Sequence, residues 1–278
     1  MRKIEKMEVI ESVKRLCLDA NFTLNGNILK KISSFKKTEE SPIGKKILSQ
    51  LEENSSIANT EKKPLCQDTG LVVVFLEMGK VIVDFDIYDA INEGVRRAYK
   101  EGYLRNSTLK HPLNRENTGD NTPAVVHTKL INADHIKITV APKGGGSENM
   151  SRLKMLTPAE GYQGVKDFVL ETVTIAEGKT CPPIIVGVGI GGNFEKSAIL
   201  AKEALMRDID DSSNEEIAKK LEKELLTEIN NLGIGPMGFG GSTTALAVKV
   251  NTYPCHIAAL PVAVNLQCHS ARHKSVIL

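Results

Sequence analysis

Hydrophobic side chains recur at helical spacing along the first sixty residues of the chain. An apolar position every three or four residues is typical of a helix that packs one face on a core. One such face is formed by Val9, Ile10, Val13, Leu16 and Cys17. Farther on, Ser41-Pro42 has the form of a helix start, with a capping residue followed by proline at the first helical position. We therefore predict a helical segment over residues 1–60, with Cys17 as a core residue.

Beyond residue 66 the apolar positions gather into short runs bounded by glycine, proline and polar residues. Such runs predict buried strands. The predicted strands are 71–76, 183–188, 245–250 and 257–264, with an alternating neighbour at 80–86 and a strand pair at 124–131 and 135–141. The predicted helices are 87–99, 157–176, 213–232 and one that begins near 195. This order favours an α/β fold with a mixed sheet, flanking helices and glycine-rich loops, formed by residues 1–278 as a single region.

The composition narrows the range of functions. The chain has 278 residues, of which 25% are charged and 4% aromatic, and its formal net charge is +2. These values allow a large core and give no reason to expect a nucleic-acid partner. We expect neither a signal peptide nor a membrane span, because Met1–Lys14 is charged throughout and no apolar run is long enough. Five irregularly spaced cysteines do not suit a disulfide framework, so we expect a cytoplasmic protein.

Three cysteines lie in polar or Gly/Pro-rich stretches, where a packing cysteine is not expected. They are Cys66 in Pro-Leu-Cys-Gln-Asp-Thr-Gly, Cys181 in Thr-Cys-Pro-Pro and Cys268 in Asn-Leu-Gln-Cys-His-Ser-Ala-Arg. Each falls at the end of a predicted element, where a thiolate can reach a metal. Three thiolates without a fourth suit a metal or cluster that keeps one position open for chemistry.

Two further residues have both a functional and a simpler interpretation. Asp68 follows Cys66 by two positions and could move protons at a metal site, or it could merely supply a turn with Thr69-Gly70. His256 precedes Cys268 by twelve residues, and a strand and a turn could bring it back to the same site. There it could donate to a substrate carboxylate, or it could be a satisfied histidine beside an apolar strand. We interpret the neighbouring Cys255 as a packing residue.

Basic residues gather in the loops that flank the predicted strands. These residues are Arg105, Arg115, Lys143, Arg152 and Lys154. The loop Lys143–Asn149 contains three successive glycines and exposes main-chain donors. Guanidinium groups together with main-chain N–H groups suit a small dicarboxylate better than a large ligand.

A glycine-rich stretch supports a competing interpretation. Gly187-Val188-Gly189-Ile190-Gly191-Gly192 has the spacing G-x-G-x-x-G between a predicted strand and a predicted helix, as in dinucleotide-binding folds. Asp208 lies in a polar run instead of at a strand end, which counts against a dinucleotide. The simpler account is a tight turn onto a helix N-terminus.

Several of these stretches, in this order, resemble the iron–sulfur (class I) fumarate hydratase and L-tartrate dehydratase family. The resemblance covers nearly the whole chain and is to the N-terminal half of the fused enzymes, or to the α-subunit of the divided ones. It is carried by Cys-Gln-Asp-Thr-Gly at 66–70, Asn-Thr-Gly-Asp-Asn-Thr-Pro at 117–123, Ala-Pro-Lys-Gly-Gly-Gly-Ser-Glu-Asn at 141–149, Cys-Pro-Pro-Ile-Ile-Val-Gly-Val-Gly-Ile-Gly-Gly at 181–192 and Gly-Ile-Gly-Pro-Met-Gly-Phe-Gly-Gly at 233–241.

The resemblance implies a cofactor and a set of site residues. It implies a [4Fe–4S] cluster held by Cys66, Cys181 and Cys268, with the substrate at the fourth iron. It also implies two catalytic residues, Asp68 as the proton donor beside the leaving hydroxyl and His256 near a substrate carboxylate. The implied substrate-binding residues are Gln67, Asp68, Arg105, Gly145, Asn149, Arg152 and Lys154.

The activity implied is the reversible hydration of fumarate to L-malate, a step of the tricarboxylic acid cycle. L-tartrate and mesaconate are alternative substrates, because they differ from these only by a hydroxyl or a methyl group. In the family the other half supplies further cations and the base at carbon, so the resemblance implies a separate β-subunit and a hetero-oligomer. A redox iron–sulfur protein and a dinucleotide-dependent oxidoreductase stay open as alternatives from other classes.

Overall fold

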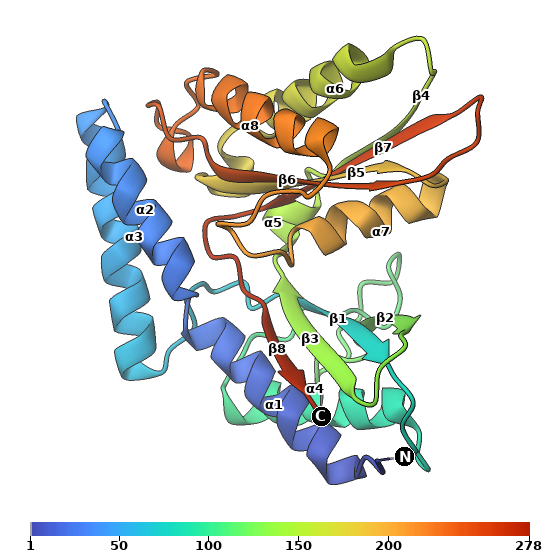
Figure 1. Cartoon of the computed structure of the whole chain (residues 1–278). Coiled ribbons are helices and arrows are strands. Elements are labelled where there is room, and N and C mark those ends of the chain that lie inside the picture. Colours follow the sequence, from blue (N-terminus) through green and yellow to red (C-terminus); the bar gives the residue numbers. More distant parts are fainter. Residues whose placement is uncertain (1) are drawn as a thin grey trace. The chain divides into compact units, whose positions relative to one another are not determined.

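A computed structural model describes residues 2–278, and the chain divides into two compact units. The first unit consists of Met1–Leu24, Ser55–Gly145 and Arg272–Leu278, and the second of Asn25–Asn54 and Gly146–Ala271. Figure 1 shows the helices and strands of both. Each unit contains a four-stranded sheet and its own hydrophobic cluster.

The first unit combines its sheet, in the order β2-β1-β3-β8, with two long helices. Its elements are α1 (Lys6–Phe22), β1 (Leu71–Met78), α4 (Ile87–Glu101), β2 (Val125–Leu130), β3 (Ile136–Lys143) and β8 (Lys274–Ile277). β1 is parallel to β2 and antiparallel to β3, and β3 is antiparallel to β8. The predicted pairing of 124–131 with 135–141 is therefore wrong, because β1 lies between these two strands. Gly94 lets α4 approach α1 closely, since a Cβ there would lie 2.7 Å from the Cβ of Val13.

The second unit has a sheet in the order β4-β7-β5-β6, with α7 on one face and α6 and α8 on the other (Figure 1). Its strands are β4 (Arg152–Leu156), β5 (Ile184–Gly191), β6 (Ala245–Tyr253) and β7 (Leu260–Gln267). Its helices are α2 (Gly26–Thr38), α6 (Gly161–Ala176), η1 (Glu177–Thr180), α7 (Phe194–Ala204), α8 (Glu216–Asn230) and η2 (Pro236–Gly238). Two further helices, α3 (Pro42–Glu61) and α5 (Gly145–Glu148), each include residues of both units.

The glycines of the G-x-G-x-x-G stretch belong mostly to β5. Val186 and Val188 of this strand join the hydrophobic cluster that includes α6 and α8, so Gly187 and Gly189, which alternate with them, face α7. A Cβ on Gly187 would lie 2.2 Å from the carbonyl oxygen of Ala201 in α7. The spacing therefore reflects close packing of a helix on a strand. The prediction that these glycines form a turn between strand and helix is therefore wrong for Gly187, Gly189 and Gly191, which lie in β5, and only Gly192 follows the strand.

The predicted fold class is confirmed, whereas two local predictions are wrong. The α/β class with mixed sheets and a helical N-terminal segment is confirmed, because α1, α2 and α3 fill residues 6–61. The predicted strand at 80–86 is wrong, since that segment has only one isolated bridge, between Ile82 and Lys3. Thr157 does not begin a helix, because its N–H and hydroxyl both bond the Glu160 side chain in a turn before α6. A single functional region over 1–278 stays a prediction.

No helix within residues 2–278 combines the length and the apolar composition that a bilayer crossing requires.

Replacing Gly189 by alanine tests the account of the glycine stretch. A Cβ at this position would lie 2.1 Å from the carbonyl oxygen of Ser197 in α7. We expect Gly189→Ala to lower the free energy of unfolding by about 1–3 kcal/mol, measured by urea denaturation. Gly26→Ala is the control, because nothing lies within 4 Å of a Cβ there. Equal stability of the two variants would contradict the packing account.

Candidate active site

The pairing of β1 with β3 brings two predicted site segments together in the first unit. Leu71, the first residue of β1, lies opposite Lys143, the last residue of β3. The turn that precedes β1 and the glycine loop that follows β3 therefore lie next to each other, at the same end of these two strands. Gly70 permits this approach with a φ of +83°, because a Cβ there would lie 2.7 Å from the nitrogen of Lys143.

The Asp68 carboxylate is held at both of its oxygens. Oδ1 accepts a hydrogen bond from the N–H of Gly70 at 3.0 Å, and Oδ2 accepts one from the N–H of Gly145 at 2.8 Å. The N–H of Asp68 itself lies 3.4 Å from the sulfur of Cys66, and the Gln67 Oε1 lies 3.3 Å from the same sulfur. A predicted metal ligand and a predicted proton donor thus share one turn with a fixed carboxylate orientation.

Buried side chains anchor this turn from behind. The hydroxyl of Tyr99 lies 2.7 Å from the carbonyl oxygen of Thr69 and 3.0 Å from that of Gly70. Burial raises the pKa of Tyr99, so the hydroxyl keeps its proton for hydrogen bonding. Asn121 Nδ2 also donates to the Gly70 carbonyl at 3.1 Å. Because the Thr69 hydroxyl donates to the carbonyl oxygen of Arg105 at 2.9 Å, the exposed Arg105 stands beside the turn.

Two of the predicted cluster ligands lie near each other in the second unit. Cys181 follows η1 with a φ of +55°, and Cys268 follows β7. The N–H of His269 donates to the Cys181 carbonyl at 3.5 Å, and Nδ1 of the same ring lies 2.9 Å from that oxygen. The sulfur of Cys268 lies 3.2 Å from the Ser270 hydroxyl and 3.5 Å from Gln267 Nε2. Polar groups therefore surround this sulfur, as they do in thiolate sites.

The other two cysteines have different surroundings. Cys17 is fully buried in the core, as predicted, and burial raises the pKa of its thiol to about 12. Cys255 is exposed, and its thiol donates to the carbonyl oxygen of Ala259 at 3.2 Å. The interpretation of Cys255 as a packing residue is wrong, because it lies in the loop before β7. The three predicted ligands are all partly buried and differ from both, which fits thiolates that hold a metal cluster.

The predicted ligand set is divided between the units. Cys66 belongs to the first unit, whereas Cys181 and Cys268 belong to the second. Over residues 2–278, no three His, Cys, Asp or Glu side chains form a group that could hold a metal ion. The donor chemistry of each cysteine fits a cluster, and the ligand set as a whole stays a prediction.

Three predicted substrate-binding residues lie in the second unit, namely Asn149, Arg152 and Lys154. The two cations among them pair with carboxylates. Arg152 lies 3.2 Å from Glu171 and covers the ring of Phe168 at 5.2 Å. Lys154 lies 3.5 Å from Glu160. Both cations therefore neutralise charges of the α6 segment, whereas Asn149 is exposed. Their roles toward a substrate stay predictions.

His256 lies far from Cys268 along the same strand. It precedes β7 and Cys268 follows it, and a strand of 8 residues spans roughly 27 Å. The His256 Nδ1 accepts a hydrogen bond from the N–H of Ala258 at 3.1 Å. The ring lines a mainly apolar cavity of about 550 Å³ with Tyr162 and Ile217. The expected return of His256 toward Cys268 does not occur in this unit, and its catalytic role stays a prediction.

The carboxylate of Glu39 is buried, with the residue 1% exposed, and was not predicted as a site residue from the sequence. Its Oε1 accepts hydrogen bonds from the N–H groups of Ser41 and Ser242, both at 2.9 Å, and its Oε2 from that of Thr243 at 2.8 Å. Burial alone would raise the pKa of Glu39, but the hydrogen bonds from Thr243, Ser41 and Ser242 outweigh it and hold the pKa below its ordinary value. The polar run around Glu39 offered no signal of burial.

The loop that Glu39 holds also supports the segment of Cys181. The loop between η2 and β6 contains Ser242 and Thr243, which donate to Glu39. Within η2, directly before this loop, the N–H of Met237 donates to the carbonyl oxygen of Pro182 at 2.8 Å. Pro182 directly follows Cys181. Glu39 is therefore a structural support of the loop beside a predicted cluster ligand.

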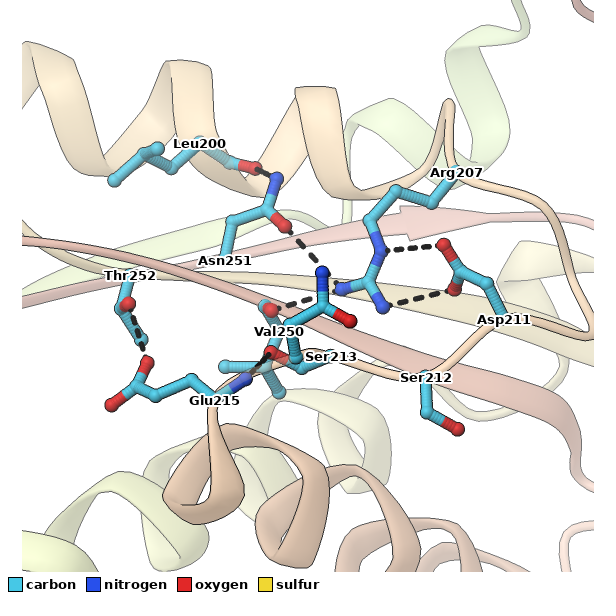
Figure 2. Close-up of a pocket in the computed structure, with 10 residues that line it drawn as sticks. Leu200, Arg207, Asp211, Ser212, Ser213, Glu215, Val250, Asn251 and Thr252 are labelled. Atoms are coloured by element: carbon cyan, nitrogen blue, oxygen red, sulfur yellow. Dashed lines mark hydrogen bonds and ion pairs between the residues drawn. The ribbon is translucent and has the colours of Figure 1, made fainter.

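A second cavity, of about 390 Å³, is lined by polar side chains that are hydrogen-bonded to one another (Figure 2). The guanidinium of Arg207 lies 3.1 Å and 2.9 Å from the two carboxylate oxygens of Asp211. It also donates to Glu222 at 2.8 Å and to the carbonyl oxygen of Val250 at 3.0 Å. The guanidinium is thus hydrogen-bonded on all sides, and the network ties the α7–α8 connection to β6.

Comparison with known proteins supports the predicted family. The fumarate hydratase (Fumerase) family matches residues 10–277. A protein of Methanocaldococcus jannaschii, provisionally named L(+)-tartrate dehydratase subunit alpha, is 43% identical over 276 residues, which are 96% of this chain and 96% of that protein. The L(+)-tartrate dehydratase subunit alpha of Escherichia coli is 29% identical over 296 residues, covering 100% of this chain and 94% of its own.

Substitution of Glu39 by glutamine tests the support of the loop. The amide would point N–H groups at main-chain donors, so we expect Glu39→Gln to lower the free energy of unfolding by about 2–4 kcal/mol at pH 7. Because the folded-state pKa of Glu39 is lowered, its contribution is present above the ordinary glutamate pKa and is lost as pH falls through the folded value. The difference from the wild type, measured by urea denaturation, should therefore shrink in acid. Glu40→Gln, at an exposed position, is the control, and an equal loss there would refute the account.

Proposed function

The chain belongs to the fumarate hydratase family of hydro-lyases, and on that premise we propose that it is the α-subunit of a [4Fe–4S] enzyme that hydrates fumarate reversibly to L-malate. The observation that carries the proposal is the turn in which Cys66 and the doubly fixed Asp68 carboxylate lie two residues apart. An enzyme that removes a hydroxyl group at a metal needs a proton-transfer group close to the ligands of that metal.

We propose that Cys66, Cys181 and Cys268 hold the cluster. Their partial burial and polar surroundings fit this donor set better than the surroundings of Cys17 or Cys255 do. When bound, such a cluster has one iron without a protein ligand, which supplies Lewis acidity toward a hydroxyl group. Reduced thiolates also require a reducing compartment, so the proposed location is the cytoplasm.

The proposed work of the first unit is binding and proton transfer. Asp68 would hold the proton that accompanies the leaving hydroxyl, and its two N–H donors would keep the carboxylate at one position throughout. Arg105 would pair with a substrate carboxylate, since its main chain is tied to the same turn. Gln67 and Gly145 would contact the substrate from the two segments that the β1–β3 register brings together.

L-tartrate is the second candidate substrate, because the relatives from Methanocaldococcus jannaschii and Escherichia coli carry its name. L-malate stays first because the family bears the fumarate hydratase description and because the loops at 117–123 and 141–149 resemble those of fumarases. Mesaconate would require only room for a methyl group. All three reactions are additions or removals of water at the two carbons between two carboxylates.

A separate β-subunit completes the proposal. The relatives are named as α-subunits, and this chain covers nearly their full length. The base that takes a proton from carbon and the remaining cations would come from the partner, giving a hetero-oligomer. Neither a membrane nor a nucleic acid has a place in this reaction.

Loss of single cysteines tests the cofactor. We expect about four iron and four sulfide per wild-type chain after anaerobic reconstitution. Cys181→Ser should lose most of both, since serine does not replace a thiolate on iron. Cys255→Ser is the matched control and should keep the wild-type content, because Cys255 lies in a different loop. Iron retained in Cys181→Ser, or lost only in Cys255→Ser, would exclude the proposed ligand set.

Kinetics of the complex with the β-subunit test the substrate. We expect kcat/KM for L-malate dehydration to exceed that for L-tartrate by about tenfold or more, because the extra hydroxyl of tartrate needs its own polar partner. The measurement is fumarate or oxaloacetate formation under anaerobic conditions. A preference for L-tartrate would overturn the choice of substrate while leaving the hydro-lyase in place. Inactivity with both, with the cluster present, would overturn the proposed function.

A further inference from the structure

One buried cation in the first unit pairs with no carboxylate of the described residues. Arg272 is 4% exposed, and it forms no ion pair within residues 2–278. Its Nη1 donates to the carbonyl oxygen of Asp68 at 2.7 Å and to Asn21 Oδ1 at 3.1 Å, and its buried Nε has no hydrogen-bond partner in the described structure. Burying a guanidinium without a carboxylate is unfavourable, so its position calls for a physical reason.

Strand register explains how Arg272 reaches the site. β8 begins at Lys274, which lies opposite Val140 in β3, and Arg272 precedes it by two residues. β1 and β8 are both antiparallel to β3, so both begin at the edge where β3 ends. Arg272 therefore enters the sheet beside the turn before β1, and its Nη2 lies 3.5 Å from the place where a Cβ on Gly144 would stand.

Arg272 donates to the carbonyl oxygen of Asp68, and the other polar atoms of Asp68 each have a different partner. The Asp68 N–H is directed at Cys66, and its two carboxylate oxygens accept from Gly70 and Gly145. The guanidinium fixes the remaining atom, the carbonyl oxygen. Asn21 is the second acceptor of Arg272, and its main-chain carbonyl oxygen also accepts a hydrogen bond from the N–H of Leu65 at 2.9 Å. One residue of α1 therefore binds both Arg272 and the segment directly before Cys66.

We propose that Arg272 is a positioning residue for the proton-transfer step. It fixes the Asp68 main chain so that the carboxylate and the Cys66 sulfur keep their relative placement. This inference rests on the proposed function, because it assigns Arg272 to a turn whose chemistry is itself proposed. Arginine is favoured at this position because the N–H groups of its planar guanidinium bind the Asp68 carbonyl oxygen and Asn21 at fixed angles. A lysine ammonium on its flexible side chain does not fix these angles.

Hydrogen exchange on the full chain separates positioning from general stability. In Arg272→Met we expect the amides of Asp68, Gly70 and Gly145 to exchange about tenfold faster, while the amides of α4 keep the wild-type rate. Arg97→Met is the matched control, because Arg97 also lies in the first unit and makes exposed ion pairs with Glu93 and Glu11. It should leave the three amides unchanged.

Kinetics of the complex supply the second readout. We expect Arg272→Met to lower kcat about 10–100-fold and to raise KM by a smaller factor, since a misplaced proton donor slows the chemistry while the same turn also carries the proposed substrate contact Gln67. Arg272→Lys should recover part of both the exchange protection and kcat, because an ammonium still donates to the Asp68 carbonyl. If Arg272→Met does not fold, Arg272→Lys decides, with a smaller but local rise in exchange expected at the same amides.

Three results would overturn the inference. One is wild-type exchange at Asp68 and Gly70 in a folded Arg272→Met protein, or in Arg272→Lys if methionine is not tolerated. Another is faster exchange spread evenly over the first unit, which indicates a purely structural arginine. The third is a change in KM without a change in kcat. An inactive wild-type complex would instead refute the proposed function, while the exchange data would still decide whether Arg272 fixes the turn.

Discussion

The candidate site depends on the pairing of strand β3 with its two neighbours, β1 and β8. β1 and β8 lie on its two sides, both antiparallel to it, so both begin where β3 ends. The turn before β1, the glycine loop after β3 and the residue two positions before β8 therefore meet at one edge of one sheet. Asp68, Gly145 and Arg272 come from these three segments and are joined by hydrogen bonds. A shift of one residue in either register would move these groups apart and reverse the faces of the strand.

Much of the fold could be predicted from local sequence, but the pairing of the strands could not. Apolar runs located β1, β5, β6 and β7 within a few residues, because burial on both faces leaves a continuous hydrophobic stretch. The same runs carry no information about partners, so β2 and β3 were wrongly paired. Gly187 and Gly189 matched a phosphate-binding spacing, although the carbonyl oxygens of α7 explain their lack of side chains. Spacing alone does not tell close helix packing from ligand binding.

The candidate site was predictable only as separate segments. Cys66 and Asp68 stood out because a thiol and a carboxylate share a short polar stretch. The hydrogen bond between Asp68 and Gly145, in contrast, joins residues that lie 77 positions apart in the sequence. Glu39 and Arg272 gave no signal, since their partners are mostly main-chain groups, and a main-chain N–H or carbonyl leaves no mark in a sequence. The prediction for His256 failed for a geometric reason, because an extended strand separates His256 from Cys268 although only eleven residues lie between them.

The charges on this chain also bear on the proposed partner. A dicarboxylate carries two negative charges, and a site that binds it in water-poor surroundings needs cations that are not already neutralised. Arg152 and Lys154 pair with glutamates of the α6 segment, and Arg272 is buried behind the Asp68 turn. Of the three cations among the predicted substrate-binding residues, only the exposed Arg105 has no ion pair among residues 2–278, and Arg115 of the predicted basic loops is likewise exposed without one. One guanidinium can hold one substrate carboxylate in a bidentate pair. The second carboxylate then requires Arg115, the release of an existing ion pair or cations from another chain, and the last of these is what the proposed β-subunit would provide.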